Sequence, residues 1–311
     1  MATTNTINSS FSGRAASGFI EAALLSGKTL DSGAVEIKDN IQYKEVIRKF
    51  ASDANLIKAG TCDFSATGTL TTTEVVLTPA EIQVNLQLCS QSYRSSWDSL
   101  QMKGINSKLP QTLGGFMLEH VVKKVAAGME TAVWQGTSGG DIPFDGWEVL
   151  AAADATVVDV AKSAITASNV TTELGKVVDA IPTTVYGHQD LYIYVPTAIY
   201  QAYIRSLGGF GAADSANSTT GVDSKMNTWY RNQQELYFDG IKLLHCPGMT
   251  ATDMIATTKE NLLFGTSLYS DLNQASIIDM GPIDGSQNSR IVLRGSATAA
   301  LGFGSEVVFY S

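Results

Sequence analysis

QTLGGFMLEHVVKKVAAGMETAVW, residues 111–134, decides the fold, because it is the clearest helix in the sequence. Pro110 stands where helices often begin, and Gly136 stands where they often end. Apolar residues recur every three or four positions and others widen that stripe: Leu113, Met117, Val121, Val125, Gly128 and Ala132, with Phe116, Val122, Met129 and Val133. At 1.5 Å per residue this helix is ~36 Å long. We therefore expect it to be the axis around which the other elements are arranged.

The sequence before this helix has the composition of β-strands. Thr67–Leu77 is rich in β-branched residues and poor in helix formers. Farther on, apolar and polar residues alternate, as in a strand with one buried face; the apolar ones are Ile82, Val84, Leu86 and Leu88. We predict two or more strands in a long antiparallel excursion over Asn55–Cys89. Its Thr-rich part has too little apolar surface for a core of its own, so another subunit is a reasonable candidate to cover it.

The N-terminal part offers few apolar anchors. The first ~14 residues contain only Ile7 and Phe11 as large apolar side chains, so we expect disorder there. A short amphipathic helix is predicted over Ala15–Leu25, ended by Gly27, and a second over Tyr43–Phe50. A basic start followed by an apolar run is missing, so we expect no signal peptide and folding in a cytoplasm. No apolar stretch approaches the ~18 residues needed to span a bilayer.

The sequence after the long helix predicts a second structural unit. Gly136–Gly140 is expected to be a flexible break and a domain boundary. Beyond it, Thr172 is predicted to cap a helix that ends at Pro182. Leu191–Val195 has the pattern of an apolar strand, and Pro196 is expected to open another helix. This helix–strand–helix order is typical of an α/β layer.

The C-terminal third is predicted to be mostly strands. Gly208–Asp223 is rich in Gly, Ala, Ser and Asn, which indicates a mobile loop. The strands expected after it are Ile241–His245, Asp253–Thr257, Ser276–Met280, Arg290–Arg294 and Val307–Tyr310. The predicted fold class is therefore α+β, with helices and antiparallel strands segregated. No fixed-period repeat indicates a solenoid.

Composition points to a protein that contacts other proteins. Charged residues make up only 16% of the 311 residues. When another protein covers such a surface, few charged side chains lose their hydration. The net charge of −9, from 21 basic and 30 acidic residues, argues against nucleic-acid binding as the main activity, because phosphate binding gains affinity through cations. The same acidity suits the wall of a container for nucleic acid. Cys62, Cys89 and Cys246 are odd in number and far apart, which predicts reduced, partly buried thiols without a disulfide framework.

The sequence carries no recognisable catalytic chemistry. His120 is expected to be a packed or edge residue of the long helix, and His188 with Asp190 lacks a third metal ligand. His245 and Cys246 are adjacent in a strand and so point to opposite faces. The glycine groups near residues 208–211 and 302–304 lack the context of a phosphate site and predict turns, as does the sequence Asp-Gly-Ser at 284–286. We predict no enzyme, with no catalytic, cofactor-binding or metal-binding residue and no cofactor.

Three stretches carry a family resemblance. Phe19–Leu30, Asn261–Asp271 and Leu301–Tyr310 are similar to segments of a group of phage capsid proteins. The order of predicted elements also resembles the Hong Kong 97-type major capsid proteins of tailed bacteriophages, over residues ~15 to 311. That order is an arm with a short helix, a long β excursion, a long central helix, an α/β region and a return through strands.

The resemblance implies a domain organisation. Residues 1–35 would form an N-terminal arm reaching a neighbouring subunit. Residues 36–137 would form the first part of the peripheral (P) domain, with the extended E-loop at about 52–88 lying over an adjacent subunit and the spine helix at about 111–134. Residues 138–260 would form the axial (A) domain, and residues 261–311 would return as strands to the P domain.

The resemblance also implies a function and partners. The chain would assemble with itself, as hexamers and pentamers, into an icosahedral head that encloses double-stranded DNA without sequence-specific binding. Its further partners would be a portal protein, a scaffolding protein and a decoration protein, with no membrane involved. It would be made in the bacterial cytoplasm and reside in the virion. The alternatives are an encapsulin-like compartment that holds a cargo enzyme, and a phage tail-tube or fibre protein, against which the long helix counts.

Overall fold

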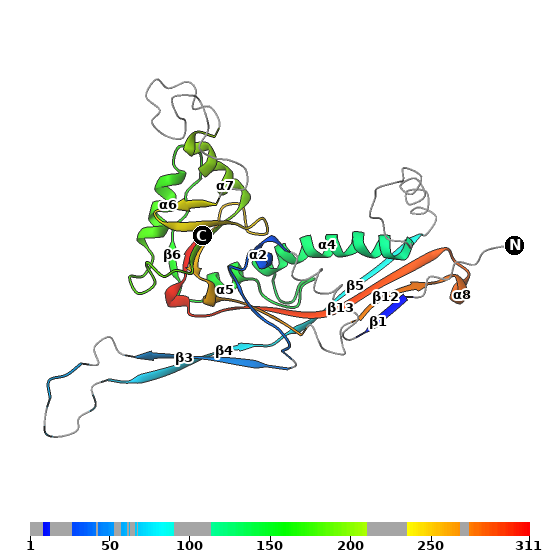
Figure 1. The fold of residues 1–311 in the computed structure, drawn as a ribbon, viewed down its shortest axis with the longest axis horizontal. Coiled ribbons are helices and arrows are strands. Elements are labelled where there is room, and N and C mark those ends of the chain that lie inside the picture. Colours follow the sequence, from blue (N-terminus) through cyan, green and yellow to red (C-terminus); the bar gives the residue numbers. More distant parts are fainter. Residues whose placement is uncertain are drawn as a thin grey trace.

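Figure 1 shows the computed structural model of the chain, in which a two-stranded ribbon projects from a body built on two six-stranded sheets. The structure describes residues 9–12, 27–41, 43–52, 57–60, 62, 66, 68–89, 113–209, 235–267 and 274–311. The first strand, β1, belongs to one six-stranded sheet, and the last strand, β14, belongs to the other.

The first sheet, here called the long sheet, is organised by its longest strand. It consists of β1 (Ser9–Ser12), β2 (Glu36–Lys38), β5 (Ala80–Cys89), β11 (Leu262–Thr266), β12 (Gln274–Asp279) and β13 (Asn288–Leu301). One edge of β13 pairs with β12 and then with β11, while the other edge pairs with β5 along ten residues. The strand β1 extends the sheet beyond β12, and β2 extends it beyond β11.

The long helix α4 (Leu113–Gln135) lies along this sheet, as Figure 1 shows. The buried side of α4 and the inner side of β5 and β13 form one core, to which Ile82, Val84 and Leu88 of β5 contribute by alternation. The short helix α5 (Trp147–Ala153) closes that core. Trp147 and Trp134 are fully buried with their rings edge to face, 4.9 Å apart, and the Trp147 Nε1–H donates to the backbone oxygens of Leu263 and Ala300.

The second sheet, here called the compact sheet, contains parallel as well as antiparallel pairs. Its order is β6 (Val158–Val160), β14 (Val308–Tyr310), β10 (Met254–Thr258), β7 (Leu191–Val195), β9 (Ile241–His245) and β8 (Leu236–Phe238). The pairs β6–β14 and β7–β9 are parallel. The helices α6 (Val170–Asp179) and α7 (Thr197–Ile204) pack on it, and α7 continues into the π-helical turn η1 (Arg205–Gly209).

The compact sheet belongs to two cores because neighbouring residues of a strand point to opposite faces. Tyr194, Ile255 and Phe309 face the core that contains α4 and α5. Ile193, Met254 and Ala256, with Val308 and Tyr310, face the core beneath α6 and α7. The two cores therefore share one sheet.

Most elements predicted after the long helix are confirmed. The predicted strands Leu191–Val195 and Ile241–His245 have the observed bounds, and α4 ends one residue beyond the predicted Trp134. The turn at 284–286 is also confirmed, since α8 (Gly281–Asp284) and the left-handed Gly285 connect β12 to β13. β13 is much longer than the predicted Arg290–Arg294.

Several predictions are wrong. Tyr43–Phe50 forms no helix, because β3 (Glu45–Ser52) pairs along its whole length with β4 (Leu70–Leu77). Its apolar residues fit both periods, and the β-branched residues of β4, which favour a strand, provide the partner for the ladder. Ser9–Ser12 is not disordered, since it pairs with β12. The predicted C-terminal strand is confirmed as β14, which pairs with β10 in the compact sheet and whose side chains alternate between the two cores.

Two further expectations need correction near helix ends. The helix α6 begins at Val170, with Asn169 rather than Thr172 at its cap position. Gly136 is no loose hinge: it is buried, and a Cβ there would lie 2.4 Å from the carbonyl oxygen of Ala132 and 3.0 Å from that of Phe144. The predicted helix over residues 15–25 lies outside the described residues, as does the predicted loop beyond Gly209.

Trp147→Ala tests the packing between α5 and the long sheet. The substitution removes the largest side chain of α5 from a fully buried position, so we expect the free energy of unfolding to fall by about 3–5 kcal/mol. Urea unfolding followed by circular dichroism measures it. Tyr186→Ala, at a half-exposed position, is the control and should change stability by less than about 1 kcal/mol. Equal losses for both variants would contradict the assigned core.

Candidate assembly surface

The ribbon formed by β3 and β4 has two different faces. In an antiparallel pair, residues directly opposite each other share a face. One face, here called the inner face, carries the pairs Glu45–Leu77 and Ile47–Val75, with Thr73 and Thr71 of β4. The other, here called the outer face, carries the pairs Val46–Val76, Arg48–Glu74 and Phe50–Thr72, with Leu70 of β4.

The base of the inner face is anchored to the long sheet. Leu77 is fully buried against Ile41 and Leu263, with Ile47 and Val75 packed around them. The backbone N–H of Ile41 donates to the carbonyl of Thr266. Gly265 allows this close approach, since a Cβ there would lie 2.8 Å from Cδ1 of Ile41. The ribbon therefore leaves the body from a fixed point.

The outer face is apolar and uncovered within the described residues. Val46 and Val76 are 45% and 47% exposed, and Phe50 and Leu70 are 67% and 68% exposed. Between these pairs, Nε of Arg48 lies 2.8 Å from the carboxylate of Glu74. A two-stranded ribbon is marginal in water without a further layer, and clustered apolar exposure marks an interaction surface. The outer face is therefore the best candidate for a contact with another protein.

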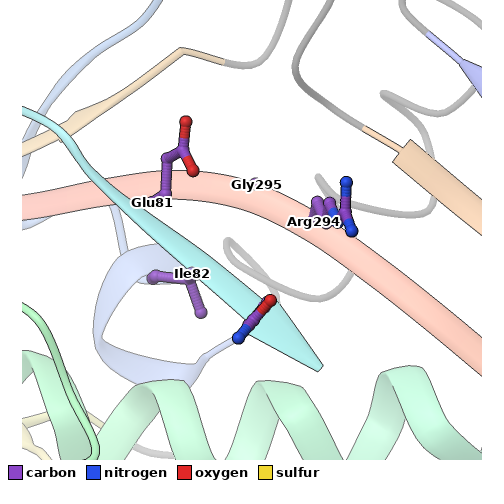
Figure 2. A pocket seen from close by; sticks show the side chains of 5 residues that line it. Glu81, Ile82, Arg294 and Gly295 are labelled. Atoms are coloured by element: carbon purple, nitrogen blue, oxygen red, sulfur yellow. The ribbon is translucent and has the colours of Figure 1, made fainter. Parts of the chain in front are cut away.

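The outward side of the long sheet offers a polar surface that could receive such a contact. Figure 2 shows Glu81 and Arg294 at a groove of about 450 Å³ on β5 and β13, with Ile82 pointing the opposite way, toward the core. Gln83 lies directly opposite Arg294, and Gln87 lies opposite Arg290 and accepts a hydrogen bond from its Nε–H at 3.2 Å. Amide side chains are desolvated more cheaply than charges, so this surface suits a buried interface.

A buried carboxylate attaches the N-terminal segment to α4. Glu130, only 6% exposed, accepts hydrogen bonds from the N–H and the hydroxyl of Thr29 in α2 (Lys28–Asp31). The Thr29 hydroxyl oxygen accepts in turn from Nε1–H of Trp134 at 3.1 Å. A few residues on, the Tyr194 hydroxyl donates to the carbonyl of Ala34 at 2.5 Å. Sequence alone did not reveal this site, although the position of Glu130 directly after Met129 of the apolar stripe was a usable signal.

The histidines do not come together. His120 is exposed on α4, and His188 lies in an exposed turn, where its Nδ1 accepts from the N–H of Asp190 at 3.3 Å. His245 ends β9, and its pKa lies below its ordinary value because of burial and the nearby Lys28. Among the described residues, no three side chains of His, Cys, Asp or Glu are grouped as metal ligands would be.

The three cysteines are free thiols in different surroundings. Cys62, in the connection between β3 and β4, and Cys89, at the end of β5, are exposed, whereas Cys246 is buried. Burial raises the pKa of Cys246, so its thiol stays protonated near neutral pH. Within the described part of the chain, no helix is both long and apolar enough to cross a membrane.

Known structures share this fold over nearly the whole chain. A capsid chain of the native GTA particle matches with a TM-score of 0.59 at 11% identity, covering 100% of this chain and 94% of that one. A chain of the satellite phage P4 procapsid, which includes the size determination (Sid) protein, gives 0.58 at 10% identity over 94% and 98%. A chain of the virus-like particle from Pyrococcus furiosus gives 0.50 at 7% identity over 95% and 96%. The sequence itself matches no protein-family model and no curated protein.

These matches define the fold. The chain has the mixed α and β fold of Hong Kong 97-like capsid proteins, which confirms the predicted fold class in its coarse form. The expectation of antiparallel strands throughout is wrong, because the pairs β2–β11, β6–β14 and β7–β9 are parallel. At 10–11% identity the likeness concerns the backbone, so which segments act as arm, E-loop and domains is a separate question.

Thr29→Val tests the attachment of the N-terminal segment. The substitution keeps the side-chain shape but leaves Glu130 without its hydroxyl donor and Trp134 without its acceptor. We expect the free energy of unfolding to fall by about 1–3 kcal/mol. Thr131→Val, on the exposed side of α4, is the matched control and should stay within about 0.5 kcal/mol of wild type in urea unfolding. A Thr29 variant as stable as this control would show that the buried contacts contribute nothing.

Proposed function

We propose that this chain is the major capsid protein of a tailed bacteriophage and that it assembles with itself into an icosahedral shell. The single observation that carries the proposal is the apolar outer face of the ribbon, left bare on a chain with the fold of capsid proteins along its whole length. Burying Phe50 and Leu70 in a neighbour contributes about 1.5–3 kcal/mol for each side chain. Within the described residues nothing covers these two side chains, so a second protein can supply that gain.

The proposal assigns a role to each part. The ribbon, Glu45–Leu77, is the E-loop, which starts and ends earlier than the predicted 52–88 because β5 belongs to the long sheet. The long sheet and α4 form the P domain, and the compact sheet with α6 and α7 forms the A domain. Residues up to about 35, which include β1 and α2, form the N-terminal arm.

The ribbon of one copy is proposed to lie on the outward side of the long sheet of the next. The exposed ion pair Arg48–Glu74 lies at the middle of the outer face, and Glu81 and Arg294 line the groove that would receive it. Both surfaces thus carry one charge of each sign, which allows complementary pairing and fixes the register of the contact. A contact between unlike patches is heterologous, and such contacts close into rings when the rotation between copies permits it.

The remaining partners follow from a shell of this kind. Rings of six and five copies would form the wall, with a portal protein, a scaffolding protein and a decoration protein as further partners. The wall would enclose double-stranded DNA in the virion without reading its sequence, and it would need no catalytic residue. A net charge of −9 suits that role, because an acidic wall does not trap its contents.

A cellular compartment is the second candidate function. The match to the virus-like particle from Pyrococcus furiosus shows that the same fold builds a particle that is described as virus-like. The two candidates differ in what the shell contains. A tail tube is disfavoured, since the capsid matches extend over 94% and 100% of the chain.

Negative-stain electron microscopy of the expressed chain tests the proposal. Closed shells, or rings of five or six subunits, are the expected result. Shells that carry an enzyme would favour the compartment, whereas stacked tubes would contradict both. A chain that stays monomeric alone and with a co-expressed scaffolding protein would also contradict assembly.

Phe50→Ser with Leu70→Ser tests the role of the ribbon. We expect the double variant to fold with unchanged stability, because neither side chain reaches the core, while the concentration required for assembly rises by at least about thirtyfold. Light scattering across a concentration series measures this threshold. Tyr186→Ser is the control, because Tyr186 is half-exposed and lies between α6 and β7, away from the ribbon. It should leave the concentration required for assembly unchanged. Assembly of the double variant at wild-type concentration would contradict the assigned contact.

A further inference from the structure

Three elements far apart in the sequence meet at His245. Nζ of Lys28, in α2, lies 2.5 Å from Nδ1 of the imidazole. On the other side of the ring, Nε2 lies 2.8 Å from the hydroxyl oxygen of Thr197, the first residue of α7. The ring also stacks on Tyr200 of α7, with centroids 5.0 Å apart and planes 23° apart. His245 therefore connects the N-terminal segment to the compact sheet.

This arrangement fixes the protonation state of the imidazole. An ammonium group only donates hydrogen bonds, so Nδ1 has to accept from Lys28 and carries no proton. The ring hydrogen then sits on Nε2, from which it is donated to Thr197. A second proton would have to enter at Nδ1, where it would remove the acceptor and oppose the Lys28 charge.

The charges around the ring reinforce this preference. Burial lowers the pKa of His245, and the charge of Lys28 lowers it further. The residue opposite His245 on β7 is the apolar Val195, and α7 contributes the hydroxyl of Thr197 and the ring of Tyr200. The carboxylate of Glu130 on α4 is directed to Thr29 of the same α2. Among the described residues placed against the ring, none is a carboxylate that would stabilise an imidazolium.

The segment held by His245 is attached independently on its other side. Thr29 is bound to Glu130 of α4, and the Ala34 carbonyl accepts from Tyr194. The segment from Lys28 to Ala34 therefore links two parts of the molecule. Thr29 binds Glu130 of α4, and Lys28 binds His245, which contacts α7. Release at His245 would free Lys28 while the contacts with α4 persist.

We propose that His245 is an acid-sensitive latch, which in its neutral form holds Lys28, at the N-terminal end of α2, beside α7 and on protonation releases Lys28 while Thr29 stays bound to α4 and both cores stay folded. The latch belongs to the single chain, so it does not depend on the proposed assembly. The direction of the pH dependence follows from the linkage between proton binding and the stability of the latched state. A histidine with a folded pKa below its ordinary 6.5 stabilises the latched state fully above that pH, and the stabilisation is lost as the pH falls below it.

Hydrogen exchange of the full chain at about pH 7.5 and about pH 5.5, on either side of an ordinary histidine pKa, tests the latch. After correction for the intrinsic pH dependence of exchange, we expect the amides of residues 31 and 32, which donate to the carbonyls of Gly27 and Lys28, and those of residues 197–201 to lose protection on acidification, whereas amides of β10 keep theirs. His245→Gln, which does not titrate, should show no pH-dependent difference. His188→Gln, in the exposed turn, should respond as wild type does.

Two results would overturn the latch. One is equal protection of both segments at the two pH values in wild type. The other is an acid-dependent loss in His245→Gln that equals the wild-type loss. If that variant fails to fold, titration of the three wild-type imidazoles by NMR decides instead. A pKa of His245 below those of the exposed His120 and His188 supports the latch, and titration of all three together contradicts it.

Discussion

The structure depends on the backbone pairing of β13. Fourteen residues of this strand hold β5 along one edge and both β12 and β11 along the other. Alternation along β13 and β5 then presents one apolar side to α4, and the buried Trp147 closes the core over the end of the strand. Because β5 follows directly on β4, the same pairing determines where the ribbon leaves the body. A chain held together in this way can extend an element that has no core of its own.

That extension creates the surface proposed for assembly. The ribbon is buried only at its base, by Leu77, Ile41 and Leu263, while its outer face carries apolar side chains on both sides of an ion pair. No catalytic arrangement competes with this reading among the described residues, and the fold is that of capsid chains over nearly the full length. The buried Glu130 and the ring of His245 attach the N-terminal segment to both halves of the molecule. The described residues thus arrange a proposed assembly surface and internal contacts that attach the N-terminal segment.

Sequence alone predicted the elements whose periodicity has one interpretation. The stripe of α4 and the strands at 191–195 and 241–245 are of this kind. The segment 43–50 was misassigned because Val46, Ile47 and Phe50 fit a helix and a strand equally well, and only pairing with β4 decides between them. The place of β14 in the compact sheet and the partners of Glu130 and His245 depend on contacts across more than 45 residues of sequence, which no local pattern contains. The capsid fold was predicted through resemblance, because three stretches of sequence and the order of predicted elements were both similar to those of phage capsid proteins.

A cryo-electron microscopy structure of the assembled particle would show directly what the ribbon contacts. We expect the outer face of each ribbon, with Phe50 and Leu70, to be buried against the long sheet of a neighbouring copy, near Glu81 and Arg294. Ribbons that extend into solvent in a closed shell, with these side chains uncovered, would contradict it. The same map would show whether the body of each copy, including the pairing of β13, is unchanged on assembly.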